Sequence, residues 1–279
     1  MRARALLLLT IPLLLAACAD RTTQLDQAPQ RYQANATVLQ DRAHGPELCL
    51  GGILQSLPPQ CRGVPITNWR WDQVEGEQRR GGTTWGAYHV VGTYDGGSFT
   101  TISSGLPQPS PQPPEAELRS PCPEPPGGWR VPDPSKASQR HLESVSKTAQ
   151  AQPEFAGIWI TYLEPMGGNV AEDPGEFVLN VAFTRNLERH RAELRTRWGG
   201  RLCVTRLERS SSELQRIQDE LSGAFGRSLG LKVVTSSLGQ VDNAVDVQVV
   251  VLPGGAKAAI DHRYGAGVVH LTAALTPVG

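Results

Sequence analysis

The chain has 279 residues, of which 39% are hydrophobic, and this is enough apolar material for one large domain or two modest ones. Glycine and proline are frequent, with 29 and 22 copies, so irregular segments are expected to be common. Without residues 1–17 the chain keeps 25 basic and 27 acidic residues. This balance argues against nucleic-acid binding by general electrostatics and against polybasic attachment to anionic lipid.

Residues 1–17 have the three-part pattern of a secretory signal. Arg2 and Arg4 come first, an apolar run from Ala5 to Leu15 follows, and small residues end the segment. A membrane-spanning helix needs about 20 apolar residues, and this run is roughly half as long. We therefore expect the segment to be removed on export rather than kept as a membrane span.

The sequence Leu15-Ala16-Ala17-Cys18 resembles the lipobox of bacterial lipoproteins. In that family the cysteine is linked to diacylglycerol and the chain is cut on its N-terminal side. The resemblance implies a mature protein held by lipid on Cys18 at the extracytoplasmic face of the cell membrane. The alternative is an ordinary secretory signal in which Cys18 is a spare thiol.

Lipidation of Cys18 leaves four cysteines, an even number that suits disulfides outside the cell. Four cysteines allow three connectivities. We favour Cys49 with Cys61, because these two close a short loop, and this choice leaves Cys122 with Cys203.

The mature chain is expected to begin with a flexible tether over residues 18–45, because this segment is polar and has no apolar periodicity. A small β-rich domain is expected over residues 46–104. Its clearest element is a hairpin of Thr84–Tyr94 and Gly97–Ile102, with Asp95-Gly96 in the tight turn.

Several aromatic residues fall in this small domain, and two interpretations of them stay open. Small β-domains need aromatic residues to have a core at all, and this is the simpler interpretation. Alternatively, Trp69, Trp71 and Trp85 form a platform on which a sugar ring of an envelope glycan stacks.

A proline-rich linker is expected over residues 105–154, with a short helix over Ser138–Ala149. Between Gly105 and Pro134 lie 11 of the 22 prolines, which exclude helices and central strands there and favour extended chain. A bridge from Cys122 to Cys203 would pin this linker against the following domain.

Residues 155–279 alternate between strand and helix patterns, which predicts an α+β domain. From Leu202 the order is β, α, β, β, α, β, the ferredoxin-like arrangement, with one more strand pair and helix in front. The expected strands are Phe155–Leu163, Phe177–Thr184, Leu202–Leu207, Leu231–Ser237, Ala244–Leu252 and Val268–Leu275, and the expected helices are Asn186–Trp198, one after the capping box of Ser210 and Glu213, and Gly255–Tyr264.

The sequence contains no common catalytic signature, so we predict no catalytic residue, cofactor or metal. The six histidines are scattered; His190 is expected at a helix surface or at the rim of a core, and His262 at a helix end that favours a cation. Glu172, Asp173 and Glu176 offer oxygen ligands for calcium, but without the alternation of a calcium loop, so a solvated turn is the simpler interpretation.

Three stretches are similar to secreted proteins of high-GC Gram-positive bacteria that have no assigned activity. They are Cys49-Leu50-Gly51-Gly52 with Ser56-Leu57-Pro58-Pro59-Gln60-Cys61, Phe155-Ala156-Gly157-Ile158-Trp159-Ile160, and Val181-Ala182-Phe183-Thr184. The resemblance indicates a source and carries no catalytic residue.

These patterns together predict a non-enzymatic, lipid-anchored protein of the cell envelope that presents a binding surface to a protein or glycan partner. The alternative is a secreted protease-associated module, an inhibitor or folding aid, by analogy with small ferredoxin-like domains. An enzyme with an unfamiliar active site is the third possibility.

Overall fold

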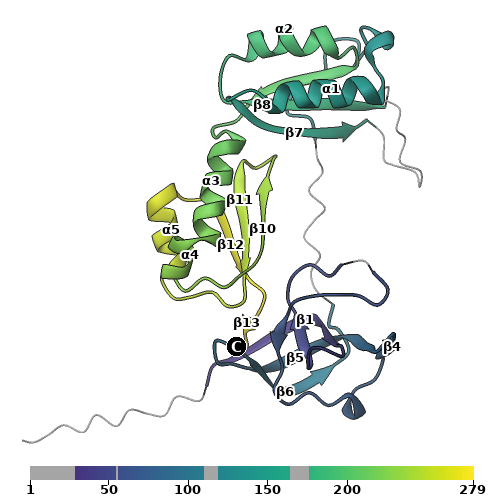
Figure 1. Ribbon diagram of the computed structural model, residues 1–279. Coiled ribbons are helices and arrows are strands. Elements are labelled where there is room, and N and C mark those ends of the chain that lie inside the picture. Colours follow the sequence, from purple (N-terminus) through teal and green to yellow (C-terminus); the bar gives the residue numbers. More distant parts are fainter. Residues whose placement is uncertain (1–28, 55, 110–118, 164–175) are drawn as a thin grey trace, which may run out of the picture.

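The computed structural model describes residues 29–54, 56–109, 119–163 and 176–279 (Figure 1). These residues have mixed α+β content. An antiparallel sheet forms mainly from the N-terminal part of the chain, and two small mixed sheets form from the C-terminal part. The predicted α+β class is therefore confirmed.

The N-terminal sheet is built on two long strands, β1 (Arg31–Gln40) and β5 (Thr83–Tyr94), which pair antiparallel along the whole of β1. Strand β6 (Phe99–Gly105) completes the predicted hairpin. In its turn the Asp95 carboxylate accepts hydrogen bonds from the backbone N–H groups of Gly97 and Ser98. The shorter pieces are β2 (Glu47–Cys49), β3 (Val64–Pro65), the 3₁₀ turn η1 (Trp71–Gln73), β4 (Gln78–Arg80) and β13 (Thr276–Pro277).

Strand β1 lies inside the segment expected to be a flexible tether, so the tether prediction is corrected for these residues. The strand alternates between its two faces, with Ala34 and Val38 buried on the core face and Asn35 exposed on the other. Much of the buried face consists of small apolar residues. The segment is therefore polar on average, although one face of the strand is apolar. The part of the tether before residue 29 lies outside the described residues.

The C-terminal region consists of two units with the same order of elements: helix, strand, strand, helix, strand. In both units the first two strands pair antiparallel, and the third strand pairs parallel to the second. The first unit contains α1 (Gln139–Gln150), β7 (Phe155–Tyr162), β8 (Phe177–Phe183), α2 (Leu187–Arg197) and β9 (Arg201–Arg206), and the second contains α3 (Ser211–Ser222), the short α4 (Ala224–Ser228), β10 (Val233–Gly239), β11 (Ala244–Val249), α5 (Ala256–Tyr264) and β12 (Val269–Ala273).

The elements from Leu202 onward follow the predicted order, but they do not share one ferredoxin-like sheet. Strand β9 pairs with β8 in the first sheet, whereas β10, β11 and β12 form the second. Strand β8 is buried along its whole length, so the backbone groups on both of its edges need a hydrogen-bonded neighbour. The sequence pattern identifies each strand but does not identify the strand with which it pairs. A ferredoxin-like domain that starts at Leu202 therefore separates β9 from β7 and β8, although these three strands form one sheet.

The end of the proline-rich linker lies against the first unit and is fixed there by the predicted disulfide Cys122–Cys203. The Arg201 Nε donates a 3.2 Å hydrogen bond to the backbone carbonyl of Trp129. The backbone of this segment approaches that of Gly199 so closely that a Cβ atom on Gly199 would overlap the backbone oxygen of Asp133. The other predicted disulfide, Cys49–Cys61, is also present.

Helix α1 occupies the place of the helix expected at the end of the linker. It buries Val145 and Ala149 in the core of the first unit together with residues of β8 and α2. The linker therefore ends before this helix, at the 3₁₀ turn η2 (Pro134–Lys136), and not at residue 154.

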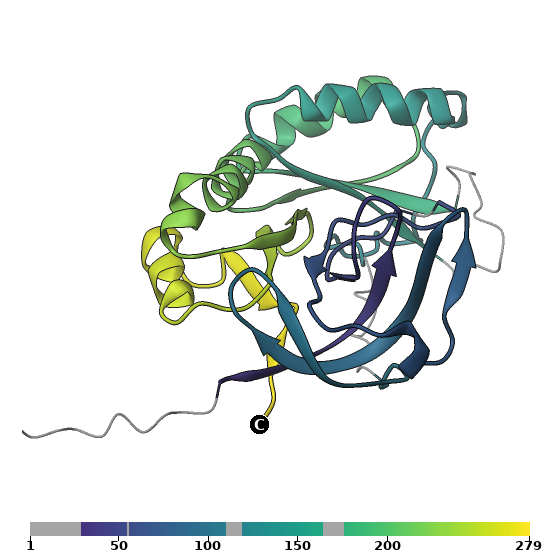
Figure 2. The same cartoon turned by 60° about the horizontal axis from the view of Figure 1, so that its bottom comes forward.

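The N-terminal sheet and the second unit share a hydrophobic core. Val250 and Leu275 of the C-terminal part are buried in the same cluster as Val38 and Phe99 of the N-terminal sheet. Strand β13 also pairs with the beginning of β1, so the two ends of the described chain lie side by side (Figure 2). The described helices are all too short or too polar to cross a bilayer.

Candidate functional site

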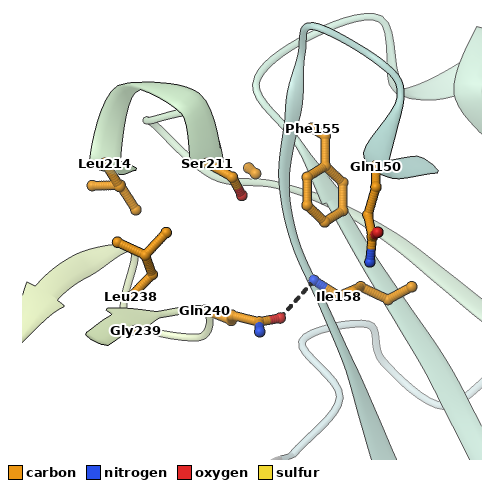
Figure 3. A pocket seen from close by; sticks show the side chains of 9 residues that line it. Gln150, Phe155, Ile158, Ser211, Leu214, Leu238, Gly239 and Gln240 are labelled. Atoms are coloured by element: carbon orange, nitrogen blue, oxygen red, sulfur yellow. Dashed lines mark hydrogen bonds between the residues drawn. The ribbon is translucent and has the colours of Figure 1, made fainter. Parts of the chain in front are cut away.

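The two C-terminal units meet where the turn between β10 and β11 contacts β7. The Gln240 side-chain oxygen accepts a 3.0 Å hydrogen bond from the backbone N–H of Ile158 (Figure 3). Beside this contact lies a hollow of about 210 Å³ between apolar side chains that include Phe155, Leu214 and Leu238. Ligand pockets commonly measure about 300–1,000 Å³, so we interpret this hollow as a packing gap.

A hollow of about 430 Å³ lies where the segment that joins the two units runs past the turn between β10 and β11. Its volume falls within the range of small-molecule sites. Exposed charged side chains of both signs border it, Arg206, Glu208 and Asp242 among them. We call it the junction hollow, and it is lined by Arg206, Leu207, Glu208, Arg209, Asp242 and Asn243.

The junction hollow has a fixed wall because Asn243 binds the joining segment twice. Its side-chain oxygen accepts a 2.8 Å hydrogen bond from the Arg209 N–H, and its amide group donates one of 2.8 Å to the Arg209 carbonyl. Asn243 is buried and has a φ of +54°, a left-handed conformation that asparagine adopts more readily than most residues. Asn243 therefore joins the segment between the two units to the turn between β10 and β11 at the wall of the hollow.

Asp242 also belongs to a group of three potential metal ligands beside the junction hollow. The Nδ1 atom of His270 lies 3.1 Å from a carboxylate oxygen of Asp246 and 3.4 Å from one of Asp242. Asp246 and His270 are direct partners on the parallel strands β11 and β12. The sequence did not predict this group, because each strand also carries a second polar residue, Gln248 in β11 and Thr272 in β12, and nothing local distinguishes Asp246 and His270 from them.

A third hollow, of about 410 Å³, lies between loops of the N-terminal sheet and strand β10. Arg62 is the one charged residue among those that line it, whereas charged residues of both signs line the junction hollow. The lining residues are Leu48, Leu50, Gly51, Gly52, Arg62, Gly63, Val64, Val233, Val234 and Val250.

The structure brings together two of the three tryptophans proposed as a ligand platform. The Trp69 ring lies 5.7 Å from that of Trp71 and 5.0 Å from that of the buried Tyr88, and all three contribute to the N-terminal core. Trp85 is three residues from Tyr88 on the same strand, so it lies on the opposite face of the sheet. Most of this aromatic surface is therefore committed to packing, as the simpler interpretation expects.

His190 is buried in the core of the first unit, so the expectation of a position at a helix surface or a core rim is corrected. Its ring is 1% exposed and stacks on Phe183, with 3.8 Å between ring centroids. Burial lowers the pKa of His190, although Glu154 lies 3.6 Å from its Nε2 atom. His262 is exposed in the last turn of α5, as its sequence position predicted.

Several predicted residues lie outside the described residues: the lipidation site Cys18 and the acidic residues Glu172 and Asp173. No family model matches the chain, and no curated protein sequence is significantly similar to it.

Proposed function

We propose that this is a lipid-anchored protein of the cell envelope that presents the junction hollow to a protein or glycan partner outside the cell. The anchoring part of the proposal comes from the lipobox resemblance at Cys18. The binding part comes from the hollow of about 430 Å³, which is lined by charged side chains of both signs.

The position of the junction hollow relative to the attachment point supports this proposal. The anchor precedes β1, and β1 pairs with β13 at the end of the chain. Strand β11 runs from the turn beside the hollow to Val249, and the next residue, Val250, packs in the core shared with the N-terminal sheet. The hollow therefore lies at the end of the second sheet that is remote from the shared core, and the exposed side chains of Arg206, Glu208 and Asp242 border it.

The charges around the hollow favour a partner of mixed charge. Arg206 and Arg209 stand beside Glu208 and Asp242, so neither sign dominates. A polyanion such as nucleic acid would meet two carboxylates there, whereas a protein surface or a glycan with amide, hydroxyl and carboxylate groups finds donors and acceptors together. The alternative of a protease-associated module rested on one ferredoxin-like sheet, and the division of these strands between two sheets leaves it without a specific supporting observation.

The binding part is tested by placing a photo-crosslinking residue at Glu208 in the cell. We expect adducts to one partner from this site and none from Glu143, an exposed residue of the same charge on α1. With that partner, or with peptidoglycan fragments if the adduct is a glycan, Arg206→Ala is expected to weaken binding about thirtyfold, which corresponds to the loss of about 2 kcal/mol that defines an interface hot spot. Equal crosslinking at both sites would contradict a specific surface.

The anchoring part predicts that Cys18→Ala shifts the protein from the membrane fraction to the soluble exported fraction. A lipid chain contributes about 0.8 kcal/mol per buried CH₂ group, and the near-neutral mature chain offers no electrostatic replacement. Fractionation after a high-salt wash, followed by immunoblotting, measures the shift. If the variant stays with the washed membranes, the protein is held there by something other than lipid on Cys18.

A further inference from the structure

We propose that Asp242, Asp246 and His270 form a binding site for a divalent transition-metal ion, with Zn²⁺ as the representative ion. The donor set is one imidazole nitrogen and two carboxylate oxygens, and not carboxylates alone. Zinc is commonly held by such nitrogen and oxygen ligands, whereas calcium prefers six to eight oxygens.

The spacing of the three donors suits one small ion. Zinc binds histidine nitrogen and carboxylate oxygen at about 2.0–2.2 Å, so two ligands at tetrahedral positions lie about 3.3 Å apart. The His270 Nδ1 atom lies 3.1 Å from Asp246 Oδ1 and 3.4 Å from Asp242 Oδ2. All three donor atoms lie within 4.8 Å of one another. Each side chain is 46–49% exposed, so the carboxylates can close around an ion by side-chain rotation.

The strands of the second unit position two of the three ligands side by side. Asp246 and His270 are paired across β11 and β12, and their strand neighbours Val245, Val247 and Val269 are buried in one cluster with residues of α3 and α5. The Asp242 carboxylate lies against a glycine, and a Cβ atom on Gly239 would overlap Asp242 Oδ1 and turn this carboxylate away from its present position. Because Gly239 has no side chain, the Asp242 carboxylate can occupy this space and lie close to the other two ligands.

Three protein ligands leave at least one coordination position open to solvent. An open position is typical of zinc sites that bind a further ligand, and structural zinc sites are closed by four protein ligands. The ion would sit beside the junction hollow, where an oxygen or nitrogen of a bound molecule reaches the open position. Metal binding is independent of the proposed partner and is tested without it.

The test is titration of the purified full chain in detergent with Zn²⁺, followed by calorimetry, and with Co²⁺, followed by its visible absorption. We expect one ion per chain and a Co²⁺ spectrum that indicates nitrogen and oxygen ligands in low coordination. His270→Gln and Asp246→Asn should each weaken Zn²⁺ binding more than about tenfold. Gly239→Ala should also weaken it, because it displaces Asp242 while keeping every ligand.

The matched control is His44→Gln. His44 Nδ1 lies 3.2 Å from one carboxylate, that of Asp41, so it resembles half of the proposed site. We expect this variant to bind Zn²⁺ like the unchanged protein. The proposal is overturned if no ion binds, if His270→Gln leaves the affinity unchanged, or if His44→Gln lowers it as much. Circular dichroism of each variant without metal checks the fold, and the exposed positions of Asp246 and His270 predict unchanged spectra.

Discussion

Replacing Cys122 and Cys203 together by alanine is expected to lower the free energy of unfolding by about 4.5 kcal/mol at 25 °C. The two cysteines are 81 residues apart in the sequence, so the bridge restricts a long loop of the unfolded chain. Loss of the bridge also frees the proline-rich segment that lies against the first unit. Unfolding in urea, followed by far-ultraviolet circular dichroism, measures the change as a lower midpoint.

The bridge between Cys49 and Cys61 provides a comparison for this prediction. These cysteines are 12 residues apart, and the same dependence on loop length gives about 3 kcal/mol for their double alanine variant. The long bridge should therefore matter more than the short one. A long-bridge variant with an unchanged midpoint would mean that the linker is held against the first unit by its hydrogen bonds alone.

The sequence predicted most single elements of the C-terminal region to within a few residues. Helix α3 shows why, because its start is marked by a capping residue: the Ser210 hydroxyl accepts a 3.2 Å hydrogen bond from the Glu213 N–H. The apolar run of β8 and the glycine that ends α5 are also local features, and each marks its element without reference to the rest of the chain. Strand β1 was not predicted because several of the apolar residues that alternate along it, such as Ala34 and Ala36, are small.

The pairing of these elements was not predictable in the same way. Strand β9 pairs with β8 across helix α2, and strand β12 pairs with β11 across helix α5. Recognition of that repeated strand, helix, strand pattern would have placed His270 next to Asp246, 24 residues away. The candidate sites stayed hidden because their residues come from different elements and have no characteristic spacing along the chain.

Leu275 lies in the core that the N-terminal sheet shares with the second unit, and we expect Leu275→Ala to lower the free energy of unfolding by about 2–5 kcal/mol. Leu275 is fully buried and lies in the cluster that contains Val38 of β1 and Phe99 of β6. The variant leaves a cavity between two parts of the chain that are far apart in sequence. Leu252, which is 46% exposed, is the control, and Leu252→Ala should change stability by less than about 0.5 kcal/mol.

Hydrogen exchange followed by mass spectrometry shows whether this core joins the N-terminal sheet to the rest of the molecule. In Leu275→Ala, peptides that cover β1 and β5 should exchange faster, although the substitution lies more than 180 residues away in the sequence. The physical reason is that β13 pairs with β1 directly after Leu275, so loosening one end of the chain loosens the other. Faster exchange confined to the second unit would instead mean that the N-terminal sheet is stable without its C-terminal strand.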